Sequence, residues 1–389
     1  MFSQRTAWPL AHNRLHQLAA ARRKSGDLLD LTVTNPTACG FHYPAAELLA
    51  ALASEAALRY EPHPLGLETA RAAVRGYYRE RGVEVGLDQL LLTASSSEAY
   101  AHLFRLLCDP GDDVLMPSPS YPLFEMLAGL HNVRLQACPM WYDHGWQLDI
   151  AALLAAATPR TRAVLLVHPN NPAGNYIQPV EWERLTAESA RRGWALVVDE
   201  VFFDYAIPPT VPGELAMADS PALVFVLNGL SKIAALPQMK LGWIAAHGPA
   251  ELRHAAMARL EVIHDLFLSV DAPIQHAASA LLGARRQLQP QIRARLRANL
   301  NRLDAALPGR RAIARLRVEG GWAVVVRLPR LHSDEAWAEL LLERAGVLTH
   351  PGFFYGFASE GHLVLSLLTP PEVFAEGVGR LIAAAEGEA

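Results

Sequence analysis

Short runs rich in leucine and β-branched residues alternate with longer Ala- and Arg-rich stretches through most of the chain. The short runs predict strands at 89–93, 113–116, 163–168, 195–198, 223–227 and 241–246, and the longer patterns predict helices at 97–107, 121–130, 179–192 and 249–260. Alternation of this kind builds βαβ units, so we expect an α/β fold with a mostly parallel, doubly wound sheet. Such sheets bind ligands beyond the carboxyl ends of their strands.

The pattern changes from about Asp271. A long stretch over 275–307, rich in Ala, Arg, Gln and Leu, predicts a helix that is broken near Pro290. Short strands then follow at 315–318, 322–328, near Val347 and at 362–367, with a helix at 333–345. We therefore expect a large domain over 45–270 and a smaller α+β domain built from residues 1–44 and 271–389.

Composition excludes several classes of protein. The chain of 389 residues is 51% apolar and 19% charged, with a net charge of -4 and no basic cluster, which argues against disorder, nucleic acid and membrane surfaces. Its three cysteines, Cys39, Cys108 and Cys138, are widely spaced, which favours a reducing compartment over disulfides or a zinc site. The first 18 residues lack an apolar signal core. We expect a cytoplasmic protein without a metal.

Lysine is rare in this chain. Only Lys24, Lys232 and Lys240 are lysines among 35 basic residues, and the last two lie eight residues apart in an apolar stretch. Arginine serves most surface roles, but it cannot form a Schiff base because it has no free amine in proteins. The pair Ser231-Lys232 therefore indicates covalent amine chemistry, for which pyridoxal 5'-phosphate (PLP) is the expected cofactor.

Two polar positions follow predicted strands, where a sheet of this type binds its ligand. Asp199 ends one strand and could pair with a protonated pyridine nitrogen, or it could simply cap the next turn. Asn171 lies in the Pro- and Gly-rich loop 168–174 and could donate to a phenolate oxygen, although a turn without chemistry is the alternative.

Two further loops complete the pattern. Ser96 and Ser97 open a predicted helix and could seat a phosphate on its free N–H groups, and an ordinary Ser cap is the alternative. Tyr121 lies on the Pro-stiffened loop 117–122, where it could stack on a flat ring or belong to the core.

Taken together, these motifs resemble the fold-type I PLP-dependent aminotransferases of class I/II, the family of aspartate aminotransferase. The most specific match is the segment 228–232 together with Leu241-Gly242-Trp243. Further matches are the segments 199–201 and 169–174, and Tyr60 followed by the segment 64–66. The resemblance extends from about Leu31 to the C-terminus.

The resemblance implies a role for each position. Lys232 would form the Schiff base and move the substrate proton, Asp199 would hold the pyridinium, and Asn171 would donate to the phenolate oxygen. Tyr121 would stack on the ring. The phosphate would be held by Ser96, Ser97, Ser231, Lys240 and, from the other subunit of a homodimer, Tyr60. The substrates would be a small amino donor and a keto acceptor.

Several positions depart from the family pattern. Lys240 stands where Arg is usual, and Phe202 replaces a Tyr that would bond the phenolate oxygen. In 361–366, Val364 replaces the Arg that clamps the substrate carboxylate, and Thr34-Asn35-Pro36 replaces Gly-x-Pro. Either another group (His350, Asn35, Tyr355 or Lys240) holds the carboxylate, or the substrate is an amine or a modified amino acid.

Transamination is the function that this pattern favours. A PLP lyase, decarboxylase or oxidase on the same scaffold is the first alternative, since fold does not fix chemistry. A non-catalytic PLP-binding module is a weaker one, because Lys232 and Asp199 are both present.

Overall fold

A seven-stranded sheet forms the centre of the larger part of the molecule. The computed structural model describes residues 1–11 and 13–388. The strand order is β2-β10-β9-β8-β7-β3-β4, and only β10 runs antiparallel to its neighbours. The strands are β2 (Leu90–Thr93), β3 (Asp113–Ser118), β4 (Arg134–Pro139), β7 (Thr161–Val167), β8 (Ala195–Asp199), β9 (Val224–Gly229) and β10 (Gly242–His247). The predicted α/β class with a mostly parallel sheet is confirmed.

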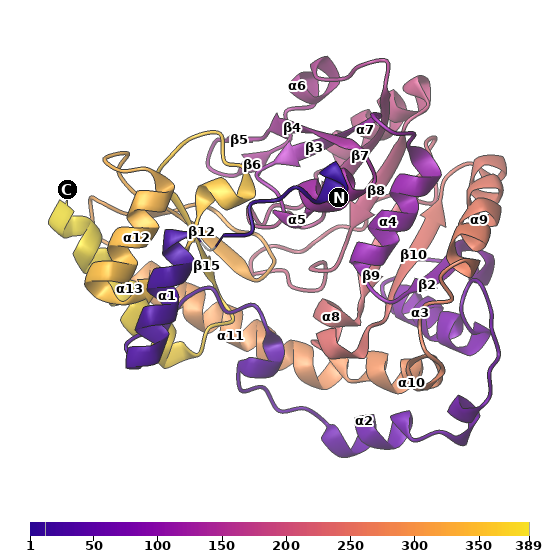
Figure 1. Ribbon diagram of the computed structural model, residues 1–389, viewed down its shortest axis with the longest axis horizontal. Coiled ribbons are helices and arrows are strands. Elements are labelled where there is room, and N and C mark those ends of the chain that lie inside the picture. The colour runs from indigo at the N-terminus through magenta and orange to yellow at the C-terminus, as the bar shows by residue number, and fades with distance from the viewer. Residues whose placement is uncertain (12, 389) are drawn as a thin grey trace.

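Helices cover both faces of this sheet (Figure 1). In β8, Ala195 and Val197 face an apolar cluster with α4 (Ser96–Leu107), α5 (Leu123–Leu130) and α9 (Ala250–Asp265). Leu196 and Val198 face the opposite cluster, which includes α3 (Glu68–Glu80), α6 (Ile150–Ala155) and α7 (Pro179–Arg192). Because both faces are buried, the strands read as continuous apolar runs.

A second, four-stranded antiparallel sheet has the order β11-β12-β15-β14. Its strands are β11 (Ala314–Arg315), β12 (Ala323–Arg327), β14 (His350–Pro351) and β15 (His362–Ser366). Near it, α1 (Arg14–Ser25) packs on α12 (Asp334–Ala345), and β1 (Leu29–Asp30) pairs with β13 (Val347–Leu348). The N-terminal segment thus packs with the C-terminal part, and these elements gather at one end of the molecule in Figure 1.

Two helices connect the two sheets. α10 (Ala272–Gly283) packs on α2 (Ala45–Leu52) and α3, whereas α11 (Arg285–Ala306) packs on α13 (Pro371–Glu388). The predicted break at Pro290 is wrong, because the helices separate at Ala284 and Pro290 lies inside α11. Its flanking residues Leu288 and Ile292 are fully buried, so packing offsets the single backbone hydrogen bond that proline removes. The division into domains at residues 45 and 271 stays a prediction.

The remaining short strands and α-helix are β5 (Trp141–Tyr142), β6 (Trp146–Gln147) and α8 (Leu230–Ile233). None of the helices in the described ranges is long and apolar enough to span a bilayer.

We predict that Leu281→Ala destabilises the protein by about 2–5 kcal/mol, because this fully buried α10 side chain packs where α2 and α3 meet the helix. Urea unfolding followed by circular dichroism measures the change. Val211→Ala, at a position 89% exposed, is the control and should stay within about 0.5 kcal/mol of wild type. Equal effects of the two substitutions would contradict the packing that we describe.

Candidate active site

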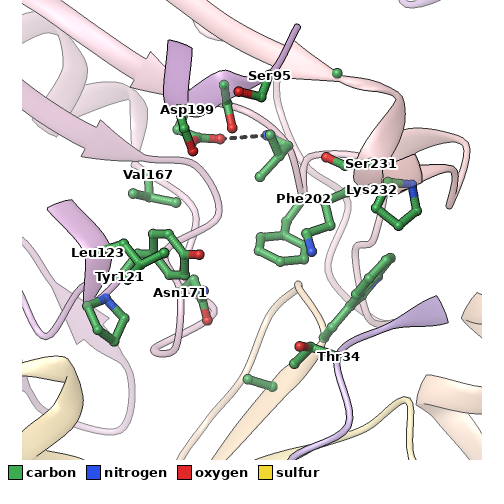
Figure 2. A pocket seen from close by; sticks show the side chains of 18 of the residues that line it. Thr34, Ser95, Tyr121, Leu123, Val167, Asn171, Asp199, Phe202, Ser231 and Lys232 are labelled. Atoms are coloured by element: carbon green, nitrogen blue, oxygen red, sulfur yellow. Dashed lines mark hydrogen bonds between the residues drawn. The ribbon is translucent and has the colours of Figure 1, made fainter. Parts of the chain in front are cut away.

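A cavity of about 470 Å³ lies at the carboxyl ends of β7, β8 and β9 and reaches the second sheet at β12 and β15. Figure 2 shows side chains from both parts of the molecule around it. The predicted site residues that line it are Ser96, Ser97, Tyr121, Asn171, Asp199, Ser231, Lys232 and Lys240. The fold therefore brings eight of the nine predicted positions to one cavity.

Lys232 projects from α8, the short helix that follows β9. Its Nζ atom lies 5.1 Å from the centre of the Trp322 ring and 5.7 Å from that of Phe202. The amine makes no hydrogen bond or ion pair with any residue in the described ranges. Burial lowers the pKa of Lys232, and the charge of Asp199 opposes that shift. The partly buried amine therefore loses its proton more readily than an ordinary lysine.

Asp199 ends β8 and is 5% exposed. Its Oδ2 atom accepts a hydrogen bond from the Tyr100 hydroxyl at 2.7 Å, and Oδ1 accepts one from the backbone N–H of Val201 at 2.9 Å, the dashed line in Figure 2. Burial raises the pKa of Asp199, while these two donors and Lys232 lower it. The turn cap considered from sequence is present, and it leaves acceptor capacity on both oxygens.

The loop before α4 forms an anion seat. Ser95 is the helix cap, since its Oγ atom accepts from the N–H of Glu98 at 3.1 Å, and Glu98 Oε2 accepts from the N–H of Ala94 at 2.6 Å. This leaves the N–H groups of Ser96 and Ser97 without an acceptor among the described residues. A helix of 12 residues thus presents free donors and the positive end of its dipole to the cavity.

Two glycines allow the chain to approach this seat closely. A Cβ on Gly242 would lie 3.1 Å from the backbone carbon of Ser95, and one on Gly229 would lie 2.9 Å from the carbonyl oxygen of Leu241. Ser231 and Lys240 line the same cavity, and the Lys240 side chain is exposed.

Glu98 also connects the seat to a distant surface segment. Its Oε2 atom accepts from the Ser269 hydroxyl at 2.8 Å, and Ser269 bonds His264 Nε2 at 2.9 Å. His264 Nδ1 in turn bonds the carbonyl oxygen of Pro64 at 2.5 Å. The segment that contains Tyr60 is thereby fixed beside the helix that carries the seat.

Tyr60 is the one predicted position that lies outside the cavity. It is 79% exposed and borders a separate surface hollow with His264 and Ser269. Within one chain the structure therefore leaves it apart from the other eight.

The substrate-side departures lie in the cavity as well. Phe202, Val364, His350, Tyr355 and Thr34 all line it. Asn35 does not line the cavity, and its Oδ1 atom instead accepts a hydrogen bond from the N–H of Thr37 at 3.1 Å.

Three residues that line the cavity were not predicted from the sequence, namely Tyr100, Ser95 and Trp322. Tyr100 follows Ser97 by three residues on the same helix, so helical spacing placed it on the face of the predicted seat. Trp322 had no local signal, because only the packing of the second sheet brings it to Lys232.

Comparisons with known proteins agree with this geometry. The family model for aminotransferase class I and II matches residues 27–381. An arginine–pyruvate transaminase of Pseudomonas aeruginosa is 31% identical over 385 residues, covering 94% of this chain and 92% of that protein. A glutamate–pyruvate aminotransferase of Escherichia coli is 24% identical over 69% of this chain and 67% of its own length.

Solved structures show the same fold. An alanine aminotransferase from Pyrococcus furiosus matches with a TM-score of 0.88 at 22% identity, covering all of both chains. An aspartate aminotransferase from Thermus thermophilus, a single mutant, matches with a TM-score of 0.84 at 24% identity over 99% of each chain.

The fold and the cavity define an α/β enzyme with a partly buried amine and a buried carboxylate in one cavity. The chain belongs to the class I and II aminotransferase family, and it is an aminotransferase.

We predict that Lys232 in cofactor-free protein reacts with acetylating reagent at a pH below the ordinary lysine range, because burial lowers its pKa. Asp199→Asn removes the nearby charge that raises this pKa, so the pH midpoint of modification should fall further. Mass spectrometry of the peptide that contains Lys232 follows the reaction. A midpoint that stays the same or rises in Asp199→Asn would contradict the coupling.

Proposed function

We propose that this enzyme binds PLP in the cavity and transfers an amino group from a small donor to a keto acid. When bound, PLP supplies an aldehyde that captures amines and a pyridinium ring that accepts the electrons released from the substrate carbon. The observation that carries this proposal is the partly buried amine of Lys232, which has no hydrogen bond or ion pair among the described residues, in a cavity that also holds the carboxylate of Asp199.

The residues present fit such a cofactor. Asp199 offers a carboxylate that Tyr100 and the N–H of Val201 orient, and a protonated ring nitrogen would relieve its buried charge. The free N–H groups of Ser96 and Ser97, with Ser231 and Lys240, supply donors and positive charge for a phosphate. Asn171 and Tyr121 line the same cavity, where we assign them to the phenolate oxygen and the ring face.

Lys232 acts twice in this proposal. Its amine would hold the cofactor aldehyde in the resting enzyme, and once a donor is bound the freed amine would serve as the base that takes the proton from the substrate Cα atom. A lowered pKa suits both tasks, because a neutral amine is the reactive form and a base works best when its pKa lies near the working pH. The rings of Phe202 and Trp322 lie beside the amine and reduce its contact with water.

We propose a homodimer with shared sites. Tyr60 would reach the phosphate of the other subunit, as the exposed position of its ring in one chain allows. Large apolar side chains lie exposed near Tyr60: Leu58 precedes it by two residues, and Leu266, Phe267 and Leu268 belong to the segment that borders the same hollow. Exposed apolar groups of this kind are typical of surfaces that a partner covers. All three cysteines are free, which supports the reducing cytoplasm as the working compartment.

The function is tested by the half-reaction. A donor alone should convert the visible spectrum of the PLP-loaded enzyme from the aldehyde form to the amine form, and pyruvate should restore it. Lys232→Ala should lower the rate of this conversion by at least about 10³-fold, because it removes the proton-transferring amine, whereas Lys24→Ala should leave the rate unchanged. Release of carbon dioxide or ammonia would favour the lyase or decarboxylase alternative, if a keto acid then fails to restore the spectrum of the aldehyde form.

We predict that Tyr60→Phe weakens PLP binding by about tenfold, the loss expected for one hydrogen bond to a charged group. Fluorescence titration of cofactor-free protein measures the affinity. Sedimentation analysis of wild type and variant at the same concentration should give a dimer in both cases. A monomer with unchanged cofactor affinity would remove the assignment of Tyr60.

A further inference from the structure

We propose that the enzyme prefers amino donors that carry no carboxylate on the amino-bearing carbon and that place an apolar group beside Val364. This inference rests on the proposed function, because it assumes that Lys232 marks the reacting centre. It names the class of donor that the rest of the cavity can accept.

The charges that line the cavity are few. Among the described residues that border it, the acidic and basic side chains are Asp199, Lys232, Lys240 and His350, and there is no arginine. Lys232 is the reacting amine. Lys240 lies two residues before Gly242, the first residue of β10 and the glycine that approaches Ser95, so we assign its charge to the anion seat. Neither cation is therefore left to hold a substrate carboxylate.

The wall at β15 is apolar. Val364 is 2% exposed, and it packs with Leu316 and Val325 and with the partly buried ring of Tyr355. Its neighbours across the sheet are Val325 on one side and His350 on the other. Trp322, Phe354 and Ala323 extend this surface in the cavity lining.

The polar groups at this end are neutral or already bonded. His350 Nδ1 and the Tyr355 hydroxyl lie 3.0 Å apart, and burial lowers the pKa of His350 and raises that of Tyr355, so this pair carries no charge at neutral pH. The Ser366 hydroxyl donates to the carbonyl oxygen of Val33 at 2.5 Å, and that of Thr32 donates to Asp30 at 2.6 Å.

A carboxylate at this wall would lose its hydration without gaining a charged partner. Burial of an unpaired charge is costly, and a guanidinium is the group that repays it through two parallel hydrogen bonds. An apolar substituent loses nothing on entering the same space and gains contact with Val364 and Trp322. A keto acid acceptor meets the same wall, so it should require a high concentration to saturate the enzyme.

Binding of two unreactive ligands isolates this effect. Isothermal titration calorimetry measures the affinity of the PLP-loaded enzyme for 3-phenylpropanamide and for 3-phenylpropanoate. The two ligands share one carbon skeleton and differ only in their end group, which is a neutral amide or a charged carboxylate. We expect the amide to bind wild type at least about tenfold more tightly, because the carboxylate loses its hydration without gaining a charged hydrogen bond in return. Val364→Arg should reverse the order, whereas Val364→Leu should preserve it. A carboxylate that binds wild type as tightly as the amide would overturn the proposal.

Wild-type enzyme alone supplies the second measurement, which stands even if Val364→Arg fails to fold. The rate of spectral conversion is compared for 2-phenylethylamine and phenylalanine, which differ only in the carboxylate. We expect the amine to have the higher second-order rate constant, by about tenfold or more. A faster reaction with phenylalanine would contradict the inference, whereas the absence of conversion by every donor tested, amines and amino acids alike, would refute the proposed function instead.

Discussion

The site depends on the pairing of β8 with β9. Parallel register places Asp199, the last residue of β8, beside Leu227, and β9 then runs to Gly229 and directly into the helix that carries Lys232. Two oppositely charged groups thus enter one buried cavity because two neighbouring strands end at the same edge of the sheet. The remaining features of the site are arranged around this pair.

The surroundings give the two groups different tasks. Tyr100 and the N–H of Val201 hold Asp199 in one orientation, while the Lys232 amine makes no hydrogen bond among the described residues and lies beside the rings of Phe202 and Trp322. A fixed carboxylate suits the binding of a cofactor ring, and an amine free of hydrogen bonds suits the transfer of a proton. The cavity wall at Val364 then determines which substrates can approach the amine.

Much of this arrangement could be predicted from the sequence, and the exceptions have physical causes. The strands β7, β8, β9 and β10 are buried on both faces, so each reads as an apolar run, whereas the edge strand β4 is mostly exposed and was not recognised. Local motifs marked Asp199, Asn171 and Lys232. Helical spacing from Ser97 was a usable local signal for Tyr100, whereas Trp322 reaches the site through the packing of the second sheet, which no local pattern encodes. The predicted partner of Tyr60 lies on another chain.

Reduction of the PLP-treated protein with borohydride, followed by peptide mass spectrometry, tests the central claim most directly. We expect a single stable pyridoxyl adduct on Lys232, which is lost in Lys232→Ala, and weaker cofactor retention in Asp199→Asn. An adduct on Lys24 or Lys240 with none on Lys232, or equal retention in Asp199→Asn, would contradict the account.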